Sequence, residues 1–371
     1  MKRYVSLLPL VLLMLLAGCR GKATVEAAVA TDSVVTQARL LKMERMPDYT
    51  LVTVANPWRA GEVLHRYVLV PADEILPGNL PEGTVIRTPL RRALVYSSVH
   101  TALMKELGEF GALAGVTDSQ YFTDPDVLAG LKSGAITDCG SSMGPTVEKV
   151  IEMMPDAILL SPYQDATYGQ ITKLDIPIVE CADYMEFTPL GRAEWIKFYG
   201  ELLGKRQQAD SIYQEVVAAY EQVKAEQQAA PGGHKTKVLT EMVISGVWNV
   251  PGGHSYMAQM IQDAGGEYPW AEDPSTGSLN LDFNQVLAVA QDADVWLIKS
   301  FFIHSRADLK GAYAMNDQFA AFQKRQVYVC DTNESRLFER FPFHPEVLLR
   351  EYANIFNHRK SEQLQFFKPV D

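Results

Sequence analysis

The side chains that could perform chemistry in this chain are four cysteines, seven histidines and a set of aromatic and polar residues that follow short apolar runs. The histidines are scattered from His65 to His358, so three converging metal ligands are not evident. There is no nucleophile elbow, Walker phosphate loop or zinc-protease helix motif. Residues 252–255 (Gly-Gly-His-Ser) predict a turn before a helix capped by Ser255. We therefore expect no enzymatic activity, no resident cofactor and no bound metal.

Cys19 is distinguished by the residues that precede it. Two basic residues begin the chain, an almost wholly apolar run spans residues 5–16, and polarity returns at Arg20. This order is typical of a signal peptide, and the run is shorter than the roughly 20 apolar residues of a transmembrane helix. Residues 16–19 (Leu-Ala-Gly-Cys) resemble the bacterial lipobox, which implies that Cys19 is acylated and holds the mature chain on a membrane surface. The alternative is a simple cleavable signal with an incidental cysteine.

The composition is that of an ordinary globular protein with sizeable cores, since 47% of its residues are hydrophobic and 21% are charged. The formal net charge of −11 argues against a nucleic-acid partner, because phosphate binding needs a basic surface. Beyond Cys19 the chain has Cys139, Cys181 and Cys330, and an odd number permits at most one disulfide. We expect three buried thiols that pack as small apolar residues.

The beginning of the chain is expected to be a leader and a tether followed by β-structure. Residues 1–18 are the predicted signal peptide, 19–35 a lipidated tether of small and polar residues, and 36–83 a β-rich extension. Within the extension, residues 50–54 and 67–70 have the composition of strands.

Two later stretches, 84–188 and 235–357, alternate short apolar strands with helical segments, which predicts a parallel sheet with crossover helices in each. Between them, residues 189–230 keep apolar side chains at helical spacing and predict one long helix, or two placed end to end. Residues 358–371 remain as a tail. The predicted fold class is therefore α/β, with two lobes built on mainly parallel sheets and joined by one long rigid helix.

Three stretches carry a resemblance to a known family. They are residues 91–118 (RRALVYSSVHTALMKELGEFGALAGVTD), 147–161 (VEKVIEMMPDAILLS) and 281–298 (LDFNQVLAVAQDADVWLI). In this order, and with the lipobox, the chain over about residues 88–357 resembles the periplasmic substrate-binding lipoproteins of ABC importers for iron complexes and vitamin B12. The resemblance implies a ligand cleft between two lobes that move only slightly.

The resemblance also implies the partners. The protein would be a monomeric receptor of the cell envelope that faces the periplasm from its lipid anchor and serves an ABC permease and its ATPase. Its ligand would be a small-molecule metal chelate, with a ferric siderophore or haem favoured and cobalamin or another corrinoid as the alternative. A receptor for bare zinc or manganese and an exported enzyme are the remaining alternatives.

Candidate ligand contacts follow the predicted strands, because ligand clefts of α/β sheets lie beyond the carboxyl ends of the strands. In the first lobe they are Ser98, His100, Tyr121, Met143, Tyr163 and Tyr184, and in the second Trp248, Trp270, Phe302, His304 and Arg336. The resemblance places Tyr121, Tyr163 and Trp270 where the family often has ligand-facing aromatics. Arg336 could neutralise an anionic chelate, and His100 or His304 could be an axial ligand. The alternatives are loop-packing aromatics and a solvated surface arginine.

Permease docking is implied by the resemblance alone. In the family, one glutamate on each lobe docks into arginines of the permease. Glu148 matches the first of these glutamates, whereas the second position holds Asn284 and so departs from the pattern. Asp282, two residues earlier, is the expected substitute. An acid at the start of a helix, such as Glu148, also interacts favourably with the helix dipole.

Overall fold

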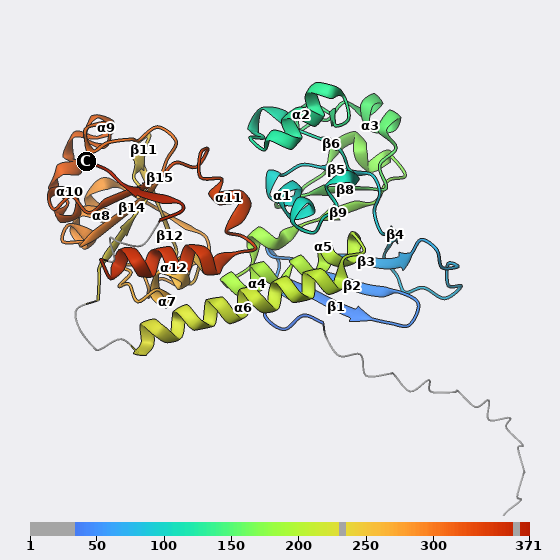
Figure 1. Ribbon diagram of the computed structural model, residues 1–371, viewed down its shortest axis with the longest axis horizontal. Helices are drawn as coiled ribbons and strands as arrows, with labels where there is room; N and C mark the ends of the chain where they lie inside the picture. The colour runs from blue at the N-terminus through green and yellow to red at the C-terminus, as the bar shows by residue number, and fades with distance from the viewer. Residues whose placement is uncertain (1–33, 230–234, 359–363) are drawn as a thin grey trace, which may run out of the picture. The chain divides into compact units, whose positions relative to one another are not determined.

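The computed structural model describes residues 34–229, 235–358 and 364–371 (Figure 1). The predicted signal peptide, Cys19 and all but the end of the predicted tether lie outside the described residues. The chain from Asp32 to Asp371 forms one compact unit. Among the described residues, no helix has both the length and the apolar character needed to cross a membrane.

The N-terminal extension is a four-stranded sheet. Its strands, in spatial order, are β1 (Leu41–Arg45), β2 (Thr50–Ala55), β3 (Val63–Pro71) and β4 (Thr84–Thr88). The first three strands are antiparallel and β4 runs parallel to β3. Buried and partly exposed residues alternate along β2, as in a strand with one face on a core. Because β4 begins at Thr84, the sheet extends one strand beyond the expected boundary at residue 83.

The first lobe is built on five parallel strands. Their spatial order is β7 (Thr137–Asp138), β6 (Leu113–Val116), β5 (Ala93–Val95), β8 (Ala157–Leu160) and β9 (Ile178–Glu180). The crossovers hold α1 (Ser98–Glu106), α2 (Pro125–Ser133) and α3 (Val147–Met153). The strand order reverses at β5, and such a switch point opens a crevice at the carboxyl ends of the strands.

Three helices occupy the stretch where one long helix, or two, was predicted. They are α4 (Pro189–Glu194), α5 (Ile196–Leu202) and α6 (Arg206–Ala229). The chain turns at Gly204, whose φ of +68° glycine adopts without strain, so α6 packs back along α5. Helix α6, with 24 residues, packs along α12 of the second lobe (Figure 1). The predicted long helix is therefore present as α6, but it is shorter than expected. Apolar residues keep helical spacing on both sides of the turn at Gly204, so the spacing did not reveal the turn.

The second lobe contains two sheets. Strands β10 (Val238–Thr240), β14 (Val295–Lys299) and β15 (Val327–Cys330) are parallel, and β16 (Phe367–Pro369) joins them antiparallel. A small antiparallel sheet holds β11 (Val243–Ile244), β12 (Val247–Pro251) and β13 (Ser278–Leu281). The helices are α7 (Tyr256–Asp263), α8 (Phe283–Ala290), α9 (Arg306–Ala312), α10 (Ala320–Gln323), α11 (Leu337–Arg340) and α12 (Pro345–Phe356). The predicted tail thus contributes an edge strand.

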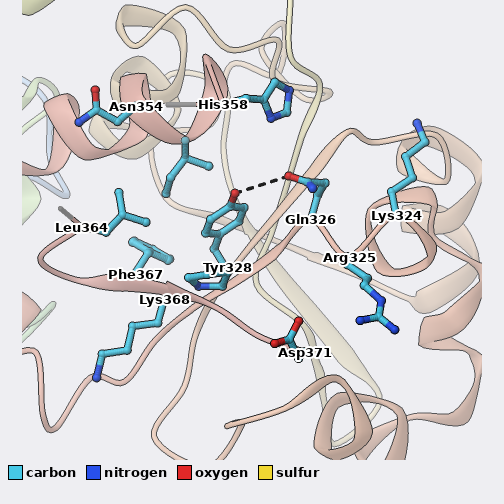
Figure 2. A pocket seen from close by; sticks show the side chains of 12 residues that line it. Lys324, Arg325, Gln326, Tyr328, Asn354, His358, Leu364, Phe367, Lys368 and Asp371 are labelled. Carbon is cyan, nitrogen blue, oxygen red and sulfur yellow. Dashed lines mark hydrogen bonds between the residues drawn. The ribbon is translucent and has the colours of Figure 1, made fainter. Parts of the chain in front are cut away.

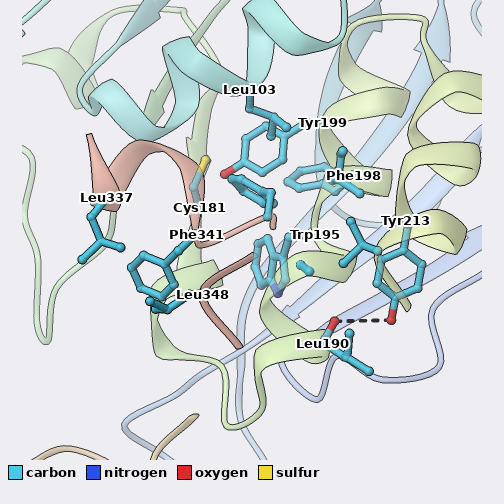
Figure 3. Close-up of a cluster of buried hydrophobic side chains, with 14 of the residues drawn as sticks. Leu103, Cys181, Leu190, Trp195, Phe198, Tyr199, Tyr213, Leu337, Phe341 and Leu348 are labelled. Carbon is cyan, nitrogen blue, oxygen red and sulfur yellow. Dashed lines mark hydrogen bonds between the residues drawn. The ribbon is translucent and has the colours of Figure 1, made fainter. Parts of the chain in front are cut away.

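One hydrophobic core joins the extension, the first lobe, the linking helices and the inner side of the second lobe. Its centre holds the fully buried rings of Trp195, Phe198 and Tyr199 (Figure 3). Strand β5 shows how the sheet divides the apolar residues, since Val95 faces this core whereas Leu94 faces a separate cluster on the other side. The extension is therefore an integral part of the first lobe.

The three cysteines within the described residues are free and buried, as expected. Cys139 packs in the outer cluster of the first lobe, and Cys181 and Cys330 pack in the main core. Burial raises the pKa of Cys139 and of Cys330 to about 11, so these thiols stay protonated and apolar at neutral pH.

Two buried glutamates hold the beginning of the extension against the linking helices. The carboxylate of Glu194 on α4 accepts the backbone amides of Thr36 (3.0 Å), Gln37 (2.6 Å) and Ala38 (2.9 Å). Glu186 accepts the next two amides, from Arg39 at 3.0 Å and Leu40 at 2.9 Å. These side chains replace the backbone partners that the segment would otherwise find in a sheet.

Replacing Glu194 with alanine tests this attachment. The variant leaves three partly buried amides unpaired, so we expect the free energy of unfolding to fall by about 3 kcal/mol or more. Urea denaturation of the purified protein measures the change. Glu215→Ala on the exposed face of α6 is the control and should lie within about 0.5 kcal/mol of the unsubstituted protein. Equal stability of the two variants would contradict the role of Glu194.

Candidate ligand-binding site

A pocket of about 320 Å³ lies between the two lobes. Its walls follow the carboxyl ends of parallel strands in both lobes, since Tyr184 comes after β9, Glu241 comes directly after β10, and Lys299 ends β14. The remaining lining residues are Met185, Glu186, Asn249, Pro251, Ser255, Tyr256, Met257, Thr276, Gly277 and Ser278. This is the position that α/β sheets offer to ligands, and we call it the cleft pocket.

An ion pair between Glu241 and Lys299 lies in the wall of the cleft pocket, which also includes the glutamate Glu186. Both side chains are about one-fifth exposed, so each can turn a charged atom toward a ligand. Glu241 has a φ of +63°, which a non-glycine residue adopts at a cost. Its amide donates to Leu297 at 2.8 Å, and its carbonyl accepts from the Trp296 indole at 2.6 Å. These bonds keep the strained turn in place at the end of β10.

A buried polar chain runs from the cleft pocket into the first lobe. The hydroxyl of Tyr256 accepts from Arg192 at 3.0 Å, and Arg192 pairs with Asp183 at 3.3 Å. Asp183 also contacts His100 at 3.4 Å and accepts from the Tyr199 hydroxyl at 3.2 Å. Burial alone would raise the pKa of Asp183, but the bonds from His100 and Arg192 outweigh it and hold that pKa below its ordinary value. A carboxylate therefore sits at the junction of the lobes and the linking helices.

A larger cavity, of about 630 Å³, lies elsewhere, within the second lobe (Figure 2). It is bordered by β15, β16 and the end of α12, and its lining includes Tyr328, whose hydroxyl is 3.5 Å from Gln326. Residues 359–363, which connect the lining residues His358 and Leu364, are outside the described residues. The cavity takes no residue from the first lobe and none of the predicted ligand contacts. The candidate site is therefore the cleft pocket.

Of the predicted ligand contacts, Tyr184 lines the cleft pocket, and its hydroxyl donates to the carbonyl of Pro162 at 2.5 Å. Tyr163, the residue after Pro162, instead lines a separate pocket of about 180 Å³ together with Trp58 of the extension. The contacts that are exposed on loops without lining the cleft pocket are Tyr121, Met143, Phe302 and His304. They offer surface to a large ligand, and their role stays a prediction.

Other predicted contacts are packed inside the protein. His100 is buried against Asp183, and Ser98 begins α1 in a partly buried position. Trp248 is fully buried, stacks on Trp296 at 5.7 Å and donates to the carbonyl of Thr240. Trp270 is half-buried against Tyr268. The Trp248 ring, whose face and indole nitrogen are already engaged, presents no surface to a ligand in this structure, and packing accounts for it. The roles of Ser98, His100 and Trp270 in ligand binding stay predictions.

Arg336 bridges the lobes. Its guanidinium donates to Asp124 at 2.8 Å and also pairs with Glu339. Asp124 caps α2 and contacts Lys105 at 3.1 Å, and these partners hold the pKa of its carboxyl below the ordinary value despite the opposing effect of burial. A second bridge joins His344, before α12, to Glu106 of α1 at 2.7 Å. The two bridges oppose separation of the lobes.

Residues 94–334, more than half of the chain, match the periplasmic binding protein family. The chain belongs to this family. An uncharacterized lipoprotein of Methanocaldococcus jannaschii is 30% identical over 231 residues, which are 58% of this chain and 54% of that protein. The match thus spans about half the length of that relative. The resemblance predicted from the sequence is confirmed.

Two solved structures show the same fold. A periplasmic haem-binding protein from Pseudomonas aeruginosa aligns with a TM-score of 0.57 at 16% identity, over 76% of this chain and 98% of that chain. A periplasmic vitamin B12-binding protein from Vibrio cholerae aligns with a TM-score of 0.52 at 13% identity, over 74% and 99% of the two chains. The α/β fold class with mainly parallel sheets and a long helix is therefore confirmed, and at such identities the likeness concerns the fold alone.

The predicted permease contacts of this periplasmic binding protein lie on two helices. Glu148 is exposed in the first turn of α3. Asn284 is exposed in the first turn of α8, and Asp282 is the N-cap of that helix. The Asp282 carboxylate accepts the amide of Gln285 at 3.0 Å, so it already has a local partner. The docking roles stay predictions.

Tyr184 is the one predicted ligand contact among the residues that line the cleft pocket, and the polar lining residues that were not predicted include Glu241, Asn249, Tyr256 and Lys299. Glu241 follows β10 and Lys299 ends β14. The search for ligand contacts at the carboxyl ends of strands would have found both residues if charged side chains had been considered as well as aromatic ones. Asn249 and Tyr256 come from β12 and α7, which no strand-end rule selects. Within the described residues, no three His, Cys, Asp or Glu side chains gather as metal ligands.

The bridge between Glu106 and His344 predicts a pH dependence of stability. Burial lowers the pKa of His344, but the bonds to Glu106 and Glu346 outweigh it and raise that pKa from 6.5 to about 10. Because the folded-state pKa is the higher one, the bridge stabilises the protein fully below about pH 6.5, and this stabilisation is lost as the pH rises through about 10. Urea denaturation between pH 6 and pH 10 measures it.

His344→Gln should show a shallower fall in the free energy of unfolding over this pH range than the unsubstituted protein. The comparison cancels the contribution of the three buried thiols, which ionise in this pH range only in the unfolded chain, where the thiol pKa is about 8.5. His304→Gln, at an exposed position, is the matched control and should retain the full slope. Parallel pH profiles for His344→Gln and the unsubstituted protein would refute the assignment.

Proposed function

We propose that this periplasmic binding protein captures an iron chelate, a ferric siderophore or haem, between its lobes and delivers it to the permease of an ABC importer. The observation that carries the proposal is the cleft pocket, which faces the carboxyl ends of the parallel strands of both lobes and carries the Glu241–Lys299 pair. Its chemistry is binding and release, with no bond made or broken in the ligand.

The character of the cleft supports a ligand that is larger than the pocket. A volume of about 320 Å³ is near the lower end of the range for small-molecule sites, roughly 300–1,000 Å³. Exposed aromatic side chains on strand-end loops, Tyr121 and Phe302 among them, can cover the remainder of a planar or macrocyclic ligand. The haem-binding and vitamin B12-binding proteins of the same fold support this ligand class, with cobalamin as the alternative to an iron chelate.

Attachment to a membrane completes the proposal. The lipobox at residues 16–19 and the lipoprotein relative support a mature chain anchored through Cys19 in the cell envelope. A tether confines the receptor to a thin layer at the membrane, which raises its effective concentration at the permease. The receptor would act there as a monomer.

Ligand titration tests the proposed function. We expect quenching of tryptophan fluorescence, with saturation at micromolar concentration or below, on addition of one of three probes: a ferric trihydroxamate, haem or cyanocobalamin. Saturation by haem or by the ferric chelate supports the iron-chelate proposal, and saturation by cyanocobalamin alone supports the corrinoid alternative. Binding of zinc with no response to any of the three probes would overturn both.

Lys299→Ala locates the ligand within the protein. The variant leaves Glu241 without its partner in the cleft pocket, so the affinity for an anionic chelate should fall about tenfold, the effect of one charge-assisted hydrogen bond. Lys310→Ala on exposed α9 is the matched control and should bind as the unsubstituted protein does. Unchanged affinity in Lys299→Ala would place the ligand outside the cleft pocket.

Permease docking gives a separate prediction. Glu148→Ala should reduce ligand uptake by cells while leaving the affinity of the purified protein unchanged, because the side chain is exposed at the start of α3 and outside the cleft pocket. Glu152→Ala, exposed on the same helix, is the matched control and should support normal uptake. A parallel loss of affinity in Glu148→Ala would instead assign the residue to ligand binding.

A further inference from the structure

A second groove, of about 460 Å³, adjoins the cleft pocket, since Ser255 and Thr276 line both. The groove is assembled from three parts of the chain. Arg39 comes from the extension, Phe187 and Thr188 come from the segment before α4, and the remaining lining residues come from α7 and the loops around it. Arg39 lies outside residues 94–334, so the family match does not include this wall.

The charge of this groove is opposite to that of the chain. The sequence has 45 acidic and 34 basic residues, yet the lining includes Arg39 and His254 and no aspartate or glutamate. Among the described residues, no carboxylate lies within salt-bridge distance of the Arg39 guanidinium, which instead lies 5.7 Å from the centre of the Phe187 ring. The other polar lining side chains are hydroxyls and amides, Thr188, Gln259 and Gln262 among them. Such a surface attracts an anion.

The turn at residues 252–255 places the amino end of α7 at the groove. A Cβ atom on Gly253 would lie 2.3 Å from the carbonyl oxygen of Trp270, so only glycine permits this close packing. Ser255 caps the helix by accepting the amide of Ala258 at 3.2 Å. The helix dipole adds positive potential to that of Arg39. His254 interacts with the nearby carboxylate of Asp273. The Oδ1 atom of Asp273 accepts the backbone amide of Ser275 at 2.8 Å, and this bond holds the pKa of the Asp273 carboxyl below its ordinary value.

We propose that this groove binds a carboxylate or phosphate arm of the chelate whose metal centre occupies the cleft pocket. Arg39 donates a charge-assisted hydrogen bond to the arm, and His254 and the first turn of α7 complete the contact. The shared residues Ser255 and Thr276 let one ligand span both spaces. That the bound arm belongs to a metal chelate rests on the proposed function, whereas the anion site itself does not. The protein is thereby selective for anionic chelates over neutral ones.

Two chelates of opposite character test the selectivity. Purified protein is titrated with ferric citrate, which is anionic, and with a neutral ferric trihydroxamate, at constant ionic strength. Arg39→Gln should bind ferric citrate about tenfold more weakly than the unsubstituted protein and the trihydroxamate equally well. Arg91→Gln, at an exposed position of the first lobe, is the matched control and should change neither affinity. An equal change, or none, for both chelates in Arg39→Gln overturns the proposal.

Metal-free citrate and inorganic phosphate separate the groove from the proposed function. Either anion should raise the thermal midpoint of the unsubstituted protein, and the rise should disappear in Arg39→Gln combined with His254→Gln. If neither chelate binds the unsubstituted protein, the iron-chelate function fails, and a lost rise in the double variant still supports the anion site. An equal rise of the thermal midpoint in the unsubstituted protein and in the double variant, or no rise in the unsubstituted protein, overturns the anion site. Circular dichroism confirms that the variants are folded.

Discussion

The buried pair between Asp183 and Arg192 is the interaction on which the arrangement of this protein depends. Asp183 ends the first lobe and Arg192 lies in the first linking helix, and both are nearly inaccessible to solvent. Taking two such charges out of water is costly, so a pair of this kind contributes specificity of geometry more than net stability. Here the geometry is the meeting of both lobes, because Arg192 also lies over Tyr256 and Phe341 of the second lobe.

Two more carboxylates extend this arrangement over twelve residues of chain. Glu186 lies between Asp183 and Arg192 in sequence and Glu194 follows Arg192, and the two glutamates accept the backbone amides of residues 36–40. The extension is thereby held to the same segment that positions the lobes, although it precedes the region of family similarity. Because its apolar faces also join the main core, it cannot separate from the first lobe without exposing that core. The extension is thus placed to contribute Arg39 to the surface beside the cleft.

The same construction limits how far the lobes can move. A hinge needs a few residues free to change their backbone angles, whereas here the connection is a pair of packed helices and the long α6. Two ion bridges, Asp124–Arg336 and Glu106–His344, join the lobes away from the linking helices. We expect a receptor built in this way to present a largely preformed cleft, so that little binding energy is spent on closing it.

From the sequence, most strands and helices of both lobes could be predicted in outline, because apolar periodicity and turn residues are local signals. The sequence predicted, in each lobe, the alternation of strands and helices to which β5, β8, β14 and α12 belong. It also determined that the three cysteines are buried thiols and, through the order of three stretches, the family. What it missed locally were the short elements without a clear pattern, such as β7 and α11.

Which side chains meet could be seen only in the packed structure. The apolar spacing of residues 189–229 is compatible with one helix or several, and the turn at Gly204 was settled by the packing of α6 on α5. Trp248 lies within β12 and Arg336 follows β15 in the chain, yet the first packs in the core and the second forms an ion bridge to Asp124. Glu241 and Lys299 are 58 residues apart in the chain and become a pair because β10 and β14 lie side by side. Periodicity tells which face of an element is apolar, but what that face contacts depends on elements far away in sequence.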